Sequence, residues 1–266
     1  MSVRAGGTCW CIMDAASSTL TSTGLPFARR ADAGSVRLGG RDVAGLMLVG
    51  DMYGAPYDLL AGFLDVAPAR LRGIVARWRR PGYAHTARLG PGPAWCWLTR
   101  SGLAVTGQHY APARPALGRL AHVRAVLAVR LSLEDSRAFR DGRAWWRSER
   151  RIRAAGGGKV GGGHVPDAEV SWPEMAGSAY AGECWAIEAE LTPKPLARTA
   201  TIMSALLART ADHQPAAPPG PGPRYHRVVY LASPTARSIV DRAAAAQPAA
   251  LRSRLVVRDL PEGALL

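Results

Sequence analysis

Acidic residues in two nearby segments of the sequence could together bind a divalent cation. Asp167 belongs to segment 164–172, whose composition is typical of a β-strand. Glu188 and Glu190 belong to a second such segment, 183–192, and point to the same face because residues two apart in a strand share a face. If the two strands are neighbours, these carboxylates converge and repel one another. A fold tolerates such a cluster mainly when a divalent cation neutralises it, and carboxylate oxygens suit Mg²⁺ or Mn²⁺.

A fourth acidic residue, Glu149, lies in a segment expected to be a helix, 144–155. On that helix Trp145, Glu149 and Ile152 would share one face. An acid on a face that ought to be buried is costly unless it has a partner or a function. Two interpretations stay equally open: Glu149 takes part in chemistry, or it pairs with Arg153 one turn later.

The positive charge of the chain is large and clustered. The chain has 34 Lys+Arg against 20 Asp+Glu, a net charge of +14, and only two lysines, Lys159 and Lys194. A GC-rich genome alone could enrich arginine. However, segment 70–88 has six arginines and no acid, and segment 137–153 has seven. Such clusters indicate a surface that binds a polyanion.

The first part of the chain predicts a small DNA-binding domain. Residues 1–38 show no sustained periodicity and are expected to form a flexible tail. Domain 39–112 then shows helices near 43–50, 57–64 and 68–80 and strand-like segments 83–89 and 94–99 joined by Gly90–Pro93. Three helices followed by a β-hairpin is the order of a winged helix-turn-helix, whose third helix enters the major groove.

The third helix and the hairpin carry the residues expected to contact DNA. In that helix the apolar residues from Leu71 to Trp78 form a stripe, and the arginines lie outside it. The alternative is a small helical domain with solvated arginines, but charge and docking element coincide, which favours DNA contact. The candidate residues are Arg70, Arg72, Arg77, Arg79, Arg80, His85 and Arg88.

The second part, domain 113–266, begins after Pro112. A long amphipathic helix from Leu117 to Leu131 is expected first, and the Gly-rich segment 156–163 is interpreted as a connector because it lacks the Lys-Ser/Thr of a phosphate loop. The remaining pattern predicts an α/β sandwich with a mixed sheet, α+β overall for the chain. Its expected elements are strands 164–172, 183–192, 225–232 and 253–260, and helices 144–155, 195–210 and 234–246.

The acidic residues resemble a known motif. Glu149, Pro166-Asp167, Glu188-x-Glu190 and Lys194 occur in the order of the PD-(D/E)xK nuclease superfamily. Together with the expected winged helix, roughly residues 40–260 resemble the bacterial replication-relaxation family, which is associated with plasmids and integrative elements. The resemblance implies a restriction-endonuclease-like domain after the winged helix.

The resemblance also implies roles for individual residues. Asp167 and Glu188 would bind Mg²⁺ or Mn²⁺, with the backbone carbonyl of Ala189 as a third ligand. The superfamily's lysine corresponds to position 190, where this chain has Glu190. Three interpretations stay open: Lys194 swings back to the site, Glu190 acts as an extra ligand or base, or catalysis has been lost.

Residues near the acids are expected to bind the DNA backbone. Arg147, Arg150, Arg151 and Arg153 would give affinity and salt sensitivity without sequence selectivity. His164 would orient water or contact phosphate, or would simply be solvated.

Three functions compete. The first is a Mg²⁺-dependent DNA endonuclease or nickase that acts in replication, relaxation or transfer of a plasmid or mobile element. The second is a non-catalytic DNA-binding accessory protein or transcriptional regulator with a degenerate nuclease-like domain, which Glu190 weakly favours. The third is a basic α/β protein whose acids form surface salt bridges, which the order of Glu149, Asp167 and Glu188 argues against.

The expected partners are double-stranded DNA, replication or conjugation proteins, and a second copy of the chain in a homodimer. The four cysteines, Cys9, Cys11, Cys96 and Cys184, show neither zinc-site spacing nor a disulfide framework. No stretch approaches 18 uninterrupted apolar residues, so no membrane segment is expected and the predicted location is the cytoplasm.

Overall fold

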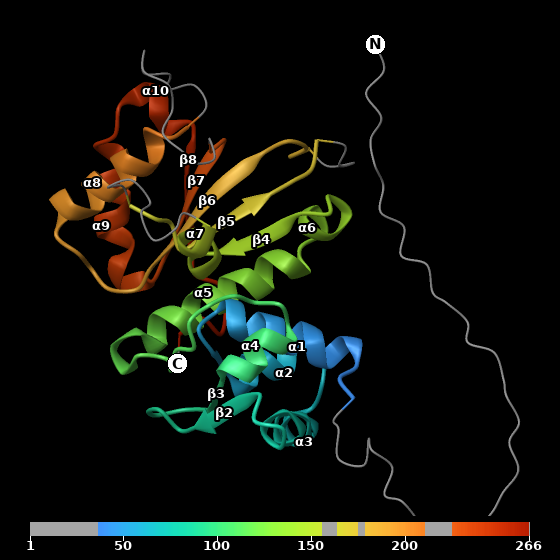
Figure 1. The fold of residues 1–266 in the computed structure, drawn as a ribbon. Coiled ribbons are helices and arrows are strands. Elements are labelled where there is room, and N and C mark those ends of the chain that lie inside the picture. Colours follow the sequence, from blue (N-terminus) through green and yellow to red (C-terminus); the bar gives the residue numbers. More distant parts are fainter. Residues whose placement is uncertain (1–36, 156–163, 175–178, 211–224, 266) are drawn as a thin grey trace, which may run out of the picture. The chain divides into compact units, whose positions relative to one another are not determined.

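The computed structural model describes residues 37–155, 164–174, 179–210 and 225–265. Residues Val36–Leu266 form one structural unit. It is a mixed α/β structure with a three-stranded antiparallel sheet and a five-stranded mixed sheet (Figure 1). Nearly all of the expected flexible tail lies outside the described residues, as do the Gly-rich connector and most of the loop before residue 225.

The first group of elements builds the three-stranded sheet and the helices around it. In chain order they are α1 (Gly40–Asp51), β1 (Ala55–Pro56), α2 (Tyr57–Phe63), α3 (Pro68–Arg79), β2 (Ala84–Ala87), β3 (Trp95–Leu98) and α4 (Arg100–Val105). Strand β3 lies in the middle and is antiparallel to both neighbours. The three helices and the hairpin expected from the sequence are present, whereas β1 and α4 were not expected.

Helix α3 follows directly from its sequence. Pro68 occupies the first turn, where a residue needs no N–H partner. The expected apolar stripe from Leu71 to Trp78 is buried, and the arginines between face solvent. The indole Nε1 of Trp78 donates a hydrogen bond of 2.8 Å to the buried carboxylate of Asp42, which ties α3 to α1.

Helix α5 (Leu120–Asp135), which follows the 3₁₀ turn η1 (Leu117–Arg119), joins the two groups of elements. It contacts β1 and α2 of the first group and also β6 (Cys184–Glu190) of the second sheet (Figure 1). Seven consecutive residues, Val123–Val129, are buried. A helix buried all round is enclosed by protein, so α5 is a central element of the fold.

The second group of elements builds the five-stranded sheet, in the order β4-β5-β6-β7-β8. Strand β5 is antiparallel to both of its neighbours, β4 and β6. Strand β7 is parallel to both of its neighbours, β6 and β8. Parallel strands need crossover connections, which α8 and α9 provide. Besides β6, the elements are α6 (Arg137–Asp141), β4 (Trp145–Ser148), α7 (Glu149–Ala155), β5 (Ala168–Ser171), α8 (Leu196–Leu207), β7 (Arg227–Ala232), α9 (Pro234–Ala245), α10 (Ala249–Arg252) and β8 (Leu255–Asp259).

The side chains of β6 alternate between two buried faces. Ile187 and Ala189 belong to the hydrophobic cluster that includes residues of α5, whereas Ala186 belongs to the cluster formed with α8 and α9. Glu188 and Glu190 lie on the face of Ala186, and both are buried. The expectation that the two glutamates share one face of the strand is confirmed.

The helix expected over residues 144–155 is wrong in its first turn. Residues Trp145–Ser148 form strand β4, which pairs with β5, and only Glu149–Ala155 are helical. Trp146 is buried while Trp145 is half exposed, an alternation typical of a strand. Aromatic residues favour strands, and so short a run does not show its period. Trp145 therefore does not share a helical face with the acid of this segment.

The strand expected over residues 164–172 begins only at Ala168. Pro166 has no N–H for a sheet ladder. The carbonyl of Asp167 accepts a hydrogen bond of 2.9 Å from the N–H of Glu149, at the start of α7. These residues therefore lead into β5 rather than form part of it.

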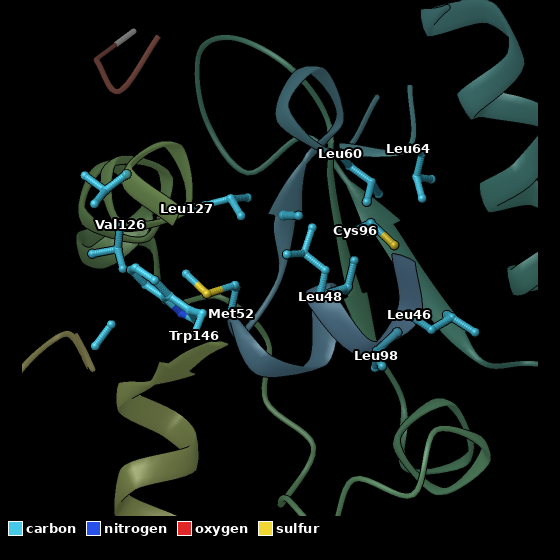
Figure 2. Close-up of a cluster of buried hydrophobic side chains, with 14 of the residues drawn as sticks. Leu46, Leu48, Met52, Leu60, Leu64, Cys96, Leu98, Val126, Leu127 and Trp146 are labelled. Carbon is cyan, nitrogen blue, oxygen red and sulfur yellow. The ribbon is translucent and has the colours of Figure 1, made fainter. Parts of the chain in front are cut away.

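One hydrophobic cluster contains residues from α1 through β7. Figure 2 shows side chains of α1, α2, β3, α5 and β4 packed together, among them Leu48, Leu60, Cys96, Leu127 and Trp146. Residues on both sides of the expected domain boundary between 112 and 113 contribute to it, and the boundary itself stays a prediction. No helix in the described ranges is long and apolar enough to cross a membrane.

Candidate functional site

The candidate site lies where β5 begins and β6 ends. The two strands are antiparallel, with Ala168 opposite Ile187. Continuing this register by one residue places Asp167 beside Glu188. The structure thus brings together the two acids that the sequence predicted as neighbours, and α5 adds His122 to them.

Glu188 is buried, with 6% of its surface exposed. Its Oε1 lies 2.8 Å from Nε2 of His164. Burial and the charge of Asp167 raise the pKa of Glu188 to about 7, against smaller lowering effects of His164 and Lys194. A buried carboxyl that changes protonation near neutral pH is typical of a functional site.

Both carboxylate oxygens of Asp167 have partners. Oδ1 lies 2.8 Å from Nε2 of His122, and Oδ2 accepts a hydrogen bond of 2.9 Å from the N–H of Ala189. Burial lowers the pKa of His122, but the bond to Asp167 and its charge raise the pKa more, so the net shift is upward. The pKa of His164 rises for the same reasons beside Glu188. Each carboxylate therefore has an imidazole partner, and the carboxylate favours the protonated, cationic form of that imidazole.

The carbonyl of Ala189 is oriented toward Asp167. In a strand the N–H and C=O of one residue point to the same neighbouring strand, and the N–H of Ala189 reaches Asp167. The β5–β6 register, continued, places Pro166 opposite Ala189, and proline has no N–H to occupy that carbonyl. This orientation is compatible with the predicted third metal ligand.

Glu190 and Lys194 form an ion pair beside these acids. Nζ of Lys194 donates to Oε2 of the buried Glu190 at 2.6 Å. The charge of Lys194 also lowers the pKa values of Glu188 and His164, so the ammonium group lies near both. The structure therefore places Lys194 at the edge of the candidate site, held there by Glu190.

Sequence reasoning missed Tyr230, which lies on β7 opposite Glu188. Its side chain is 1% exposed, and its hydroxyl has no hydrogen-bond partner among the described residues. Burial, followed by the charges of Glu188, Glu190 and Asp167, raises its pKa. An unpaired buried hydroxyl costs about 1–3 kcal/mol, which a water or an ion would relieve. A tyrosine within an apolar strand gives no signal of such a position.

Glu149 lies at the edge of the site and is fully paired. Its two carboxylate oxygens accept hydrogen bonds of 2.9 Å from Arg153 and Arg119. The pair with Arg153 is the second of the two interpretations that the sequence left open. A small cavity of about 20 Å³ lies here, and Glu149, Arg119, His122 and Asp167 are among the residues that line it. That is enough for one water.

The donors present fit a loosely held hard cation. Asp167 and Glu188 offer carboxylate oxygens, which Mg²⁺ prefers. Across the described ranges, no group of three or more His, Cys, Asp or Glu side chains could hold a metal ion. The remaining ligands would have to be the carbonyl of Ala189, waters and substrate oxygens, and Mg²⁺ usually keeps several waters.

The arginines expected to contact DNA from α3 are all exposed. They are Arg70, Arg72, Arg77, Arg79 and Arg80. Arg77 also forms an ion pair with Asp42 of α1, whereas the other four have no ion-pair partner within the part of the chain that the structure describes. His85 and Arg88 are exposed too, and the ring of His85 lies 5.8 Å from that of Trp97.

Arg150 has a different environment. Its side chain is buried, and its guanidinium donates to the backbone carbonyls of Gly50 and Ala111. The same group lies 4.7 Å from the ring centres of both Tyr53 and Tyr110. Arg150 thus connects α7 to residues near α1, and we do not include it in the proposed DNA-binding surface.

Sequence reasoning also missed another buried acid, Glu169. It lies two residues after Asp167 on β5, is 2% exposed, accepts from the hydroxyl of Tyr225 at 2.8 Å and pairs with Arg147 at 3.1 Å. Its position in a strand-like segment was the available signal. Arg147 is therefore half-buried and already paired, whereas Arg151 of α7 is exposed.

Comparisons with known proteins find only distant likeness. No family model and no curated protein matches the chain. The structure of restriction endonuclease FokI bound to DNA aligns with 87% of this chain and 44% of its own, at 9% identity and a TM-score of 0.27. The structure of PigF with SAH aligns with 82% of this chain and 61% of its own, at 14% identity and a TM-score of 0.19. The chain thus spans less than half the length of FokI and less than two thirds of PigF.

Proposed function

We propose that this chain is a DNA-binding protein with a nuclease centre at Asp167 and Glu188, which hydrolyses phosphodiester bonds with Mg²⁺ or Mn²⁺. The observation that carries the proposal is the position of these two carboxylates close together, one just before β5 and the other near the end of β6. The raised pKa of Glu188 and the nearby ammonium group of Lys194 support it. The resemblance of Glu149, Asp167 and Glu188 to the PD-(D/E)xK order adds the reaction class.

Each residue of the site would have a separate role in phosphodiester hydrolysis. A bound metal ion would lower the pKa of a water and offset charge on the phosphate oxygens. Asp167 is held in one orientation by His122 and by the N–H of Ala189, which fixes the carboxylate before substrate arrives. Lys194, one-third exposed, would steady the negative charge of the phosphate.

DNA would be held by the first group of elements. Their order, with three helices before a hairpin and a three-stranded sheet, supports a winged helix-turn-helix. The exposed arginines of α3, with His85 and Arg88 near the hairpin, would then contact duplex DNA. The exposed Arg151 of α7 is a separate candidate contact beside the nuclease centre. The α/β sandwich that follows corresponds to a restriction-endonuclease-like domain. A role in replication, relaxation or transfer of a plasmid or mobile element, with replication or conjugation proteins or a second copy as partners, rests on the resemblance alone.

A second candidate function is a DNA-binding accessory or regulatory protein without catalysis. The observation that favours it is the internal pairing of every acid at the site: Glu188 with His164, Asp167 with His122, and Glu190 with Lys194. An acid cluster neutralised by its own cations needs no metal ion. In that case the cluster would be structural.

A cleavage assay separates the two functions. We would incubate supercoiled plasmid with the protein and Mg²⁺, Mn²⁺ or EDTA, and compare Asp167→Asn and Glu188→Gln with the exposed control Asp241→Asn. Metal-dependent nicking that only the two site variants lose, with DNA affinity kept, supports the nuclease. Binding without cleavage under every metal would leave the accessory function.

A further inference from the structure

Arg119 lies at the edge of the nuclease centre with half of its side chain, 48%, exposed. It is the last residue of η1 and lines the small cavity that Asp167 and His122 also line. One guanidinium nitrogen donates to Oε2 of Glu149 at 2.9 Å. The rest of the group faces solvent beside the acids, and sequence reasoning did not single it out.

Arg119 shares its acidic partner with a second arginine. Glu149 accepts hydrogen bonds of 2.9 Å from both Arg119 and Arg153. Asp51 and Asp167 also line the cavity, so an anion is favoured only at the side of its mouth where Arg119 is half-exposed. Glu149 fixes the guanidinium of Arg119 in place there.

Tyr53 supports Arg119 from the other side. It follows α1 in the chain and has a φ of 61°, a left-handed conformation that costs a non-glycine residue about 1–3 kcal/mol. Its ring lies 4.7 Å from the guanidinium of the buried Arg150 and 5.8 Å from that of Arg119. The strained backbone thus places an aromatic ring near two arginines, one committed to the core and one half-exposed and paired with Glu149.

We propose that Arg119 forms a phosphate-binding site beside Asp167, which contacts a backbone phosphate of bound DNA, and that Tyr53 is its positioning residue. The identity of the ligand rests on the proposed function. A guanidinium presents a planar fork that matches two phosphate oxygens, and here its plane is restrained by Glu149 and by the ring of Tyr53. The phosphate lies at the open mouth of the cavity, since the interior holds only one water.

The test measures how DNA affinity depends on salt, in EDTA, so that neither a metal nor cleavage is needed. Each phosphate contact contributes about 0.9 to the slope of log K against log salt concentration on duplex DNA. We expect Arg119→Ala to lower the magnitude of the slope by about 1 and to weaken binding about tenfold or more at low salt. Arg119→Lys keeps the charge and most of the slope. Arg237→Ala removes an arginine of α9 that is paired with Asp241, and leaves the slope unchanged.

Two variants of Tyr53 test whether its ring positions Arg119 for phosphate binding. Tyr53→Phe keeps the ring and is expected to keep the wild-type slope, whereas Tyr53→Ala lowers it toward that of Arg119→Ala. An unchanged slope in folded Arg119→Ala overturns the phosphate site, even if the wild-type protein cleaves DNA. A reduced slope in a protein that never cleaves overturns the nuclease proposal alone. Absence of DNA binding by the wild-type protein overturns both.

Discussion

The ammonium nitrogen of Lys194 lies 2.6 Å from Oε2 of Glu190, four residues earlier in the chain. Glu190 stands where the resembled nuclease superfamily has its lysine. The carboxylate at that position holds a different lysine at the edge of the site, where its charge lowers the pKa of Glu188. The ion pair thus keeps a positive charge beside the acids of the candidate site.

Replacing Lys194 tests this ion pair. Lys194→Met leaves the buried carboxylate of Glu190 without its cation, and we expect the free energy of unfolding to fall by about 1–3 kcal/mol. Urea denaturation near neutral pH measures the change. The double variant that adds Glu190→Gln should recover most of the loss, because no unpaired charge remains. A single variant as stable as the wild-type protein would contradict the pair.

The raised pKa of Glu188 predicts that the stability of the protein decreases as the pH rises. Its pKa of about 7 in the folded protein exceeds the ordinary value of 4.5, so between these values the folded state binds more protons than the unfolded state. The free energy of unfolding should therefore decrease from about pH 5 to about pH 8. His122 and His164, whose pKa values are also raised, add stability at low pH that is lost in the same direction.

The variant Glu188→Gln shows how much the carboxyl of Glu188 contributes to this pH dependence of stability. The variant has no charge to bury at high pH, so its free energy of unfolding should decline less steeply than that of the wild-type protein. Urea denaturation of both proteins across the pH range gives the two slopes. Parallel profiles would show that Glu188 does not titrate in this range.

The exposed arginines of α3 predict salt-dependent binding with little sequence preference. Arg79→Ala and Arg80→Ala should each lower the slope of log K against log salt by about 1, equally for unrelated duplexes. Arg77→Ala should also lower stability, because Arg77 pairs with Asp42. Arg237→Ala is the control: it removes an arginine of α9 outside this surface and should leave the slope unchanged. Wild-type salt slopes in both alanine variants would exclude α3 from DNA contact.

Glu169, two residues after Asp167, is expected to be a structural acid. Glu169→Ala removes the buried acceptor of Tyr225 and Arg147, and we expect a loss of about 3–5 kcal/mol in the free energy of unfolding. Glu174→Ala, at an exposed position, should cost less than about 0.5 kcal/mol. Chemical denaturation compares the two. Little destabilisation by Glu169→Ala would show that its hydrogen bonds are not needed for the fold.

The sequence by itself determined the features that depend on near neighbours in the chain. The apolar stripe of α3 repeats every three or four residues, and its first residue is Pro68, so both the helix and its start can be read locally. The alternation of β6 likewise places Glu188 and Glu190 on one face. The order of the acids suggested that Asp167 would meet them, since sequential strands commonly pair.

Only the tertiary structure decided the features that depend on distant residues. Trp145–Ser148 form a strand because β5 supplies their hydrogen-bond partners, which no local pattern reveals. Arg150 is buried because residues from α1 and from the segment after α4 supply carbonyls and rings around it. His122 reaches Asp167 from a helix 45 residues earlier, and Tyr53 reaches Arg119 from the first group of elements. Local periodicity gives the face on which a residue lies, whereas its partner depends on how the whole chain packs.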